Sequence, residues 1–418
     1  MTQHGGPPLR LLIDVSHVRA TPHYTGIQRY VRHTLRHAAA LAGPAAGAGM
    51  APGDLSVGAI AAGSGGCWYA VDTLPPHPLE GLPSPQVLSA PMDSEEDFLQ
   101  PGTHVLLADR FWHTGAWAAL DALLASPAAI TLVVYDLISL RRPEWFAAGV
   151  DERFRHYLRQ VLPRAQQVVC LSAAVRRDVR EWMAAEGIPA PPILVVPPGH
   201  QVWSPPMAAA AVSGAQSRPP EGIPRAWTLG GARFVLQVGT LEPRKNHRLA
   251  WQAMQQLWRA GRTEGLLVIG QPGWLTDDFC QTLRRACAHT GSPAAPVVVW
   301  LGECTDSALD WCYRHAAAVL YPSSHEGYGL PLAEAAASGT PVVAHDTPVH
   351  REVAARAGGR VSWTSLDPTV LAEALALALD AQDVPFSPVP PRSWAQATGE
   401  LVLAMRRASA YDPADLQA

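Results

Sequence analysis

The stretch AAVLYPSSHEGYGLPLAEAAASGTPVVAHD, residues 317–346, has the pattern of a strand, a helix and a second strand. The apolar runs at its two ends are short and continuous, which is typical of parallel strands buried on both faces. Between them, Pro331 suits the first position of a helix, and Ser338-Gly339 is a typical helix end. This order indicates a parallel sheet covered by helices.

The same alternation extends over most of the chain. Further predicted strands are LRLLIDVS (9–16), HVLLAD (104–109), ITLVVYD (130–136), QVVCLS (167–172), ILVVPPG (193–199), RFVLQVG (233–239), GLLVIG (265–270) and VVVWLG (297–302). A Pro-rich stretch without periodicity, residues 203–230, divides them into two groups and is predicted to be a linker. Because 418 residues are too many for one hydrophobic core, we predict two α/β domains, at residues 1–202 and 231–390.

Ligands of open α/β sheets bind beyond the carboxyl ends of the strands. If the two sheets face each other, the cleft between them is therefore the expected site. Residues 43–66 are rich in Gly, Ala and Pro, and we expect them to form a loop.

Composition narrows the class of protein. A content of 48% hydrophobic and 16% charged residues is typical of a globular chain, and the net charge of −4 argues against nucleic-acid binding. The six cysteines form no CxxC pair, and no unbroken apolar run is long enough to cross a bilayer. We therefore expect a cytoplasmic protein. Between Arg141 and Arg180, nine arginines face four acidic residues, which fits either a solvated helix surface or peripheral contact with the inner face of a membrane.

Lys245 is the only lysine of the chain, since arginine supplies every other basic side chain. It follows Arg244 in the segment GTLEPRKNH, after a predicted strand and before a predicted helix. A cation is unfavourable at the N-terminus of a helix. This position therefore indicates that an anion binds nearby, and Asn246 is expected to cap the helix.

Glu326 and Glu334 lie on either side of the predicted start of the helix in residues 323–344. A helix N-terminus offers unpaired N–H groups and partial positive charge to a phosphate. A carboxylate beside it can accept both hydroxyls of a ribose, because its two oxygens match a vicinal diol. Gly327 and Gly329 permit close approach of the backbone. Two ordinary glutamates are the alternative interpretation.

This run resembles the E-x7-E signature of the retaining glycosyltransferases of family 4, which have two Rossmann-like domains facing across a cleft, the GT-B fold. Segments similar to that family occur in the same order along nearly the whole chain; they include TGIQRY, YDLISLRRPEWF, VVPPGH, VGTLEPRKNH, VIGQPGW and WLGEC. The resemblance implies that residues 1–202 bind the acceptor and residues 231–390 the nucleotide-sugar. It also implies that residues 391–418 form a helix that crosses back to the first domain.

The resemblance implies a role for each candidate site residue. Arg244 and Lys245 would hold the diphosphate of the donor, because charge accumulates there as the glycosidic bond breaks. Glu326 would orient donor hydroxyls, and Glu334 would hold the ribose. The remaining predicted contacts are Gly26 at the phosphates, Glu303 and Cys304 at the nucleobase, Asp136 at the sugar, and the backbone of Gly327, Tyr328, Gly329 and Leu330.

One position departs from the family pattern, since Tyr135 replaces the usual histidine before Asp136. A tyrosine hydroxyl can hydrogen-bond to a sugar but carries no positive charge, and we consider His113 as a substitute. The chain contains no Asp-x-Asp pair and no HExxH motif. We therefore expect neither a metal nor another cofactor.

The resemblance predicts a retaining, metal-independent hexosyltransferase that uses a nucleotide-sugar donor. The acceptor would be a glycan or a lipid-linked oligosaccharide in surface polysaccharide synthesis. TGIQR and GQPGW are similar to bacterial mannosyltransferases, which favours GDP-mannose, with UDP- or dTDP-sugars as alternatives. Two other functions stay open: a catalytically weak protein that binds a nucleotide-sugar, and a sugar-nucleotide epimerase.

Overall fold

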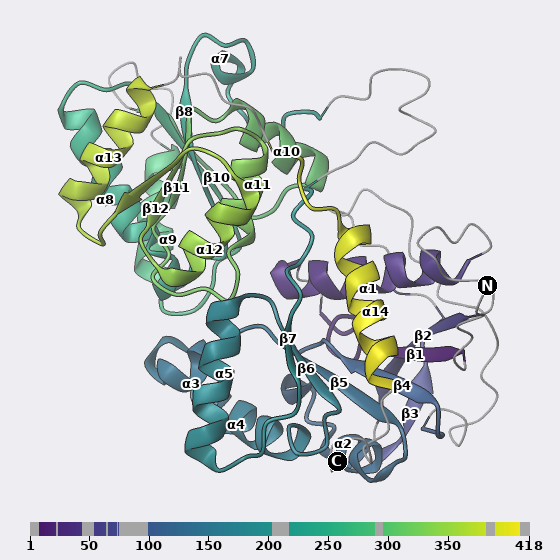
Figure 1. Cartoon of the computed structure of the whole chain (residues 1–418). Helices are drawn as coiled ribbons and strands as arrows, with labels where there is room; N and C mark the ends of the chain where they lie inside the picture. The colour runs from purple at the N-terminus through teal and green to yellow at the C-terminus, as the bar shows by residue number, and fades with distance from the viewer. Residues whose placement is uncertain are drawn as a thin grey trace.

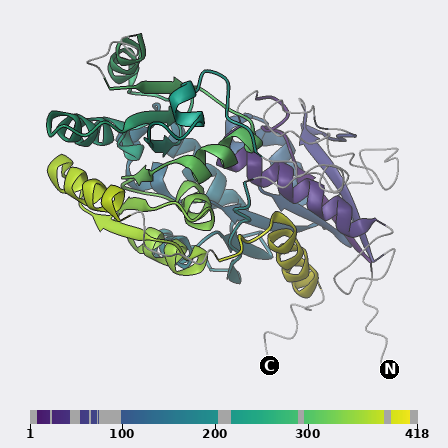
Figure 2. The same ribbon diagram turned by 90° about the horizontal axis from the view of Figure 1, so that it is seen from above.

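A computed structural model describes residues 8–21, 24–43, 54–63, 66–72, 74, 99–202, 217–288, 296–381 and 389–409. Two sheets, each covered by helices, form the architecture seen in Figure 1 and, from above, in Figure 2. The described part of the chain thus has the α/β fold with two parallel-sheet domains that the sequence predicts.

The first sheet has seven strands in the order β3-β2-β1-β4-β5-β6-β7. All neighbours in it are parallel except β2 and β3. Its strands are β1 (Leu9–Asp14), β2 (Leu55–Ala62), β3 (Trp68–Ala70), β4 (Thr103–Leu107), β5 (Ala129–Val134), β6 (Gln167–Cys170) and β7 (Ile193–Val195). The helices of this part are α1 (Gly26–Ala42), α2 (Trp117–Ala125), α3 (Ile138–Arg141), α4 (Val150–Val161) and α5 (Ala173–Glu186), with short 3-10 turns at η3 (Phe111–His113) and η4 (Pro143–Trp145).

The second sheet is entirely parallel, with six strands in the order β10-β9-β8-β11-β12-β13. Its strands are β8 (Phe234–Val238), β9 (Gly265–Ile269), β10 (Val298–Leu301), β11 (Ala318–Tyr321), β12 (Val342–His345) and β13 (Val361–Thr364). The covering helices are α8 (His247–Arg259), α9 (Asp277–Ala288), α10 (Asp306–His315), α11 (Leu330–Ala337), α12 (Pro348–Ala357) and α13 (Pro368–Asp380).

The structure differs from the sequence predictions within two connecting segments. Within residues 43–66, β2 pairs in parallel with β1 from Leu55 to Ile60. Because many of its residues are small, this segment has little intrinsic preference for a strand. Pairing with the neighbouring strand stabilises it instead. Within the predicted linker, α7 (Arg225–Thr228) buries Trp227 against Phe234, with ring centroids 4.8 Å apart. These linker residues therefore pack on the second domain.

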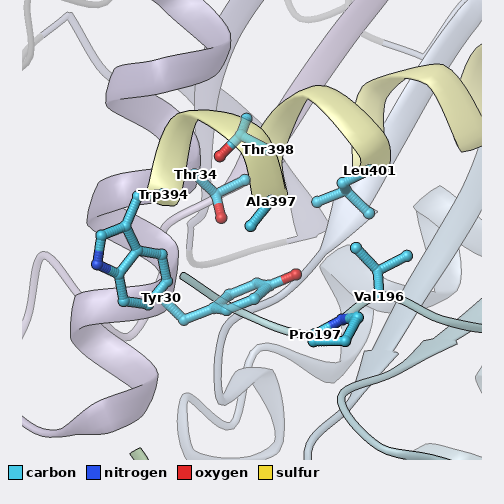
Figure 3. Close-up of a pocket in the computed structure, with 8 residues that line it drawn as sticks. All are labelled: Tyr30, Thr34, Val196, Pro197, Trp394, Ala397, Thr398 and Leu401. Atoms are coloured by element: carbon cyan, nitrogen blue, oxygen red, sulfur yellow. The ribbon is translucent and has the colours of Figure 1, made fainter. Parts of the chain in front are cut away.

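The final described helix, α14 (Trp394–Ser409), leaves the second domain and lies on α1 of the first (Figures 1 and 2). The indole of Trp394 stacks on the imidazole of His33, with centroids 4.5 Å apart. Figure 3 shows the narrow crevice at this joint, lined by Tyr30, Thr34, Val196, Pro197, Trp394, Ala397, Thr398 and Leu401. The last helix therefore ties the two domains together.

The loops that follow the strands of the two sheets touch directly. Ser172, which caps α5, donates its hydroxyl to the carbonyl of Gly327 at 2.9 Å. A Cβ atom on Gly327 would lie only 1.9 Å from the carbonyl oxygen of Tyr135, so glycine is required for this approach. The carboxyl edges of both sheets therefore meet at residues that the sequence singled out.

Candidate active site

A basic pair and a carboxylate form the centre of the site. Arg244 and Lys245 lie in the 3-10 turn η5 (Pro243–Lys245) after β8, and Glu326 lies in the loop between β11 and α11. Arg244 Nη1 is 2.7 Å from Glu326 Oε2, and Lys245 Nζ is 2.6 Å from Glu326 Oε1. Each cation thus takes one oxygen of the same carboxylate.

Backbone contacts fix this arrangement. The carbonyl of Arg244 accepts from the backbone N–H of Ser324 at 2.8 Å, which joins the two loops. Asn246 adopts a left-handed conformation with φ 54°. Its side chain does not cap α8 as predicted, because it donates to the carbonyl of Pro322 at 2.8 Å. Asn246 therefore ties the turn that carries the basic pair to the end of β11.

The charges of the site balance one another. Burial alone would raise the pKa of Glu326, but the charges of Arg244 and Lys245 outweigh it and hold this pKa well below its usual range. Glu242 supplies a second carboxylate, with Oε1 2.6 Å from Arg244 Nη2. The two cations are thus neutralised by acidic side chains of their own domain.

Asp136 approaches this cluster from the first domain. Its Oδ1 accepts the backbone N–H of Ile138 at 3.0 Å. Burial raises the pKa of Asp136, and the positive charge of Arg244 partly offsets the rise. A carboxyl group with a raised pKa therefore faces the basic pair across the domain boundary.

Tyr135 and His113 are both engaged within the first domain. The hydroxyl of Tyr135 donates to the carbonyl of Ala108 at 2.6 Å, and its ring packs edge-on against Tyr30. His113 Nε2 lies 2.5 Å from Arg110 Nη2, and because arginine can only donate, the imidazole accepts. Burial and the charge of Arg110 lower the pKa of His113 to about 3. In this conformation the Tyr135 hydroxyl and the Nε2 atom of His113 are both occupied by partners in the first domain.

Glu334 belongs to a second polar cluster, which crosses the domain boundary. It is 1% exposed on α11. Its Oε1 accepts from Arg29 Nη1 at 2.6 Å, and its Oε2 accepts from the hydroxyl of Tyr313 at 2.8 Å. Gly26 begins α1, where a Cβ atom would lie 3.5 Å from Leu330 Cδ1 at the start of α11. The N-terminal turns of two helices from different domains therefore pack against each other.

The other predicted residues line the edges of these clusters. Gly329 has φ 99° ahead of α11, and Tyr328 is buried. Glu303 is exposed, and its Oε2 accepts from Gln271 Nε2 at 3.1 Å. Burial raises the pKa of the Cys304 thiol to about 12, which makes it an inert group.

Sequence reasoning missed two buried carboxylates at the carboxyl edge of the first sheet. Asp14 ends β1, where its Oδ1 accepts the N–H of Ser16 at 2.9 Å. Asp109 follows β4, and its Oδ2 accepts the backbone N–H groups of His17 and Val18 at 2.7 and 2.6 Å. Both end apolar strand segments, LRLLID and HVLLAD, and this position was the available signal.

The described residues include no group of three or more His, Cys, Asp or Glu side chains arranged to hold a metal ion. None of the helices in the described ranges combines the length and apolar character needed to cross a bilayer. Within the arginine-rich segment, Arg141 pairs with Asp178, and both Arg155 and Arg159 pair with Glu186.

The second domain is similar to known proteins. Residues 223–387 match the family model of glycosyl transferases group 1. The serotype-specific mannosyltransferase WbdA of Escherichia coli is 32% identical over 247 residues, which cover 56% of this chain and 28% of the relative. The O-antigen chain mannosyltransferase RfbU of Salmonella typhimurium is 46% identical over 126 residues, which cover 29% of this chain and 31% of the relative. The alignments thus span less than a third of each relative's length.

Solved structures are similar over nearly the whole chain. Sucrose-phosphate synthase from Thermosynechococcus elongatus has a TM-score of 0.53 at 16% identity and covers 96% of both chains. The Anabaena protein HepE, in complex with UDP and glucose, has a TM-score of 0.54 at 15% identity and covers 96% of this chain and 95% of its own. At these identities the similarity shows the fold alone. The GT-B fold and the resemblance to glycosyltransferases, predicted from the sequence, are confirmed.

The buried Asp14 predicts a pH dependence of stability. Burial and the charge of Asp109 raise the pKa of Asp14 from 3.8 to about 8. The folded chain therefore keeps a proton that the unfolded chain releases, so stability falls as pH rises through this window. We expect Asp14→Asn to have a higher thermal unfolding midpoint than the wild type at pH 8, and the difference to shrink towards pH 5. The exposed Asp121→Asn is the control, and midpoint curves of Asp14→Asn that run parallel to wild type would contradict the assignment.

Proposed function

From the premise that residues 223–387 match glycosyl transferases group 1, we propose that the chain transfers a hexose from a nucleotide-sugar to a glycan or lipid-linked acceptor in surface polysaccharide synthesis. The configuration of the anomeric carbon is retained, and no metal ion is needed. The single observation that carries the proposal is the buried cluster of Arg244, Lys245 and Glu326 in the loops where the two sheets meet.

The basic pair matches the charge that develops in this reaction. Breaking the bond between the anomeric carbon and the phosphate leaves negative charge on the departing diphosphate. Arg244 can bind two of its oxygens as a fork, while Lys245 places a compact charge at one. A preorganised cation that meets charge only as it develops lowers the barrier. In the structure, the Glu326 carboxylate is the anion that pairs with both cations.

Donor binding then releases Glu326 for a second role. When the diphosphate takes over both cations, the carboxylate turns to accept hydrogen bonds from donor hydroxyls. The proton of the acceptor hydroxyl passes to a phosphate oxygen of the donor, and attack takes place on the face that the diphosphate leaves. Asp136 contacts the sugar from the first domain.

Mannose from GDP-mannose is the proposed donor sugar. The names of the relatives WbdA and RfbU support it, since both are mannosyltransferases. UDP- and dTDP-sugars remain the alternatives. A protein that binds a nucleotide-sugar without turnover is the second candidate function, because the Tyr135 hydroxyl is already bound to Ala108.

A binding and turnover experiment tests the proposal. We expect GDP to raise the thermal unfolding midpoint more than UDP, dTDP or ADP, because the donor site recognises the base. Labelled GDP-mannose should then yield a labelled glycan only when an acceptor is supplied. Tight nucleotide binding without transfer would favour the binding protein, and conversion of the donor without any acceptor would indicate an epimerase.

We expect variants that lack Lys245 or Glu326 to transfer the sugar more slowly. Lys245→Ala and Glu326→Ala should each lower the transfer rate, by about 10²–10³-fold for the lysine, as for loss of one group that stabilises a developing anion. The control is Arg248→Ala, because this exposed arginine, the second residue of α8, forms its ion pair with exposed Asp278. Circular dichroism checks the fold of each variant. Near-normal rates in Lys245→Ala would contradict the site assignment.

Chelation tests the metal-free mechanism. Because Arg244 and Lys245 supply the positive charge, we expect transfer rates in excess EDTA to equal those without it. The measurement is initial rate with and without the chelator, followed by addition of magnesium. Strong inhibition that magnesium reverses would refute this part of the proposal.

A further inference from the structure

Arg29 is a buried cation that the proposed reaction does not use. It lies on the first turn of α1 in the first domain, yet its closest charged partners are on the second. Nη1 is 2.6 Å from Glu334 Oε1, and Nε is 3.8 Å from Asp306 Oδ1. The side chains of Arg29 and Glu334 are 8% and 1% exposed. The pair is therefore a desolvated ion pair between the two domains.

This pair stands where the ribose of the donor is expected. Under the proposed function, Glu334 accepts the two ribose hydroxyls. In the structure one of its oxygens is bound to Arg29 and the other to Tyr313. A ribose can reach Glu334 only after the Arg29 side chain moves away.

The ion pair is also incompletely satisfied. Arg29 Nε and Nη2 are buried and have no hydrogen-bond partner among the described residues. A buried N–H donor without an acceptor destabilises the folded protein, because it has lost the hydrogen bond that it would make to water. These two donors would gain hydrogen bonds to water if the Arg29 side chain moved out, which offsets part of the cost of breaking its ion pair with Glu334.

We propose that the Arg29 side chain, paired with Glu334, occupies the position that the ribose of the donor takes, and that the ribose diol displaces it from Glu334. The inference rests on the proposed function, because it needs Glu334 to be the ribose ligand. Arg29 is thus a positioning residue that sets donor affinity. A donor must compete with the ion pair, so the apparent affinity is lower than the intrinsic affinity of the exposed carboxylate.

The test compares two nucleotides in three variants. Calorimetry measures the Kd of GDP and of 2′,3′-dideoxy-GDP, or of the matching pair for the base that the thermal-shift panel selects. In Arg29→Met we expect GDP to bind about tenfold more tightly, within the usual range of coupling between linked sites. The dideoxy nucleotide lacks the diol and leaves Arg29 in place, so its Kd should stay within about twofold. Arg29→Gln should change the two Kd values in the same way as Arg29→Met. It is used in place of Arg29→Met if the methionine variant does not fold.

Glu352→Gln is the matched control for domain opening. Glu352 on α12 accepts the backbone N–H of Ala173 at 2.9 Å on the first domain, away from Glu334. Its substitution loosens the domain contact and should change both Kd values by the same factor. If Glu352→Gln bound GDP more tightly but left the Kd of the dideoxy nucleotide unchanged, the role of Arg29 would be overturned.

The remaining outcomes separate the inference from the proposed function. Unchanged or weaker GDP binding in Arg29→Met, or equal gains for both nucleotides, overturns the inference. If the wild type still binds GDP more tightly than the dideoxy nucleotide, Glu334 remains the proposed ribose ligand even though the inference about Arg29 is wrong. If neither the wild type nor Arg29→Met shows such a preference, the ribose role fails and the inference falls with it.

Discussion

Charge buried between two domains is the constraint on which this structure depends. Glu326 holds Arg244 and Lys245 in the second domain, and Glu334 binds Arg29 across the domain boundary. Removing one partner of a buried ion pair typically costs about 3–5 kcal/mol, because the other charge is left uncompensated. Each buried charge must therefore keep a compensating partner or receive another one. Under the proposed function, the diphosphate of a nucleotide-sugar would replace Glu326 as the anion beside the basic pair, and the ribose diol would donate hydrogen bonds to Glu334 in place of Arg29.

The backbone brings these charges together. Gly327 lets the loop before α11 touch the carbonyl of Tyr135, and Ser172 donates to the carbonyl of Gly327. A side chain at position 327 would separate the domains at the point where Asp136 faces Arg244. The glycine that the motif contains therefore serves the contact between domains as well as any contact with a donor.

The sequence predicted the fold class well because parallel strands buried on both faces are continuous apolar runs with helices between them. It failed where tertiary contacts outweigh local preference. The strand β2 is stabilised by pairing with β1, and Trp227 draws part of the expected linker onto the second domain. Asn246 looked like a cap, yet its side chain binds Pro322 on a different loop. Asp14 and Asp109 were overlooked because nothing in a short segment reveals how deeply a carboxylate is buried.

The sequence alone determined the alternation of strands and helices and the single lysine beside Arg244, and its motifs indicated a glycosyltransferase. These features follow from residue type and spacing, which are local. Only the tertiary structure decided which charges neutralise one another: Glu326 with the basic pair, and Glu334 with an arginine about three hundred residues away in the chain. Such pairing depends on distances of a few ångströms between loops of different domains. Those distances are set by how the two sheets pack, which no segment of the sequence specifies by itself.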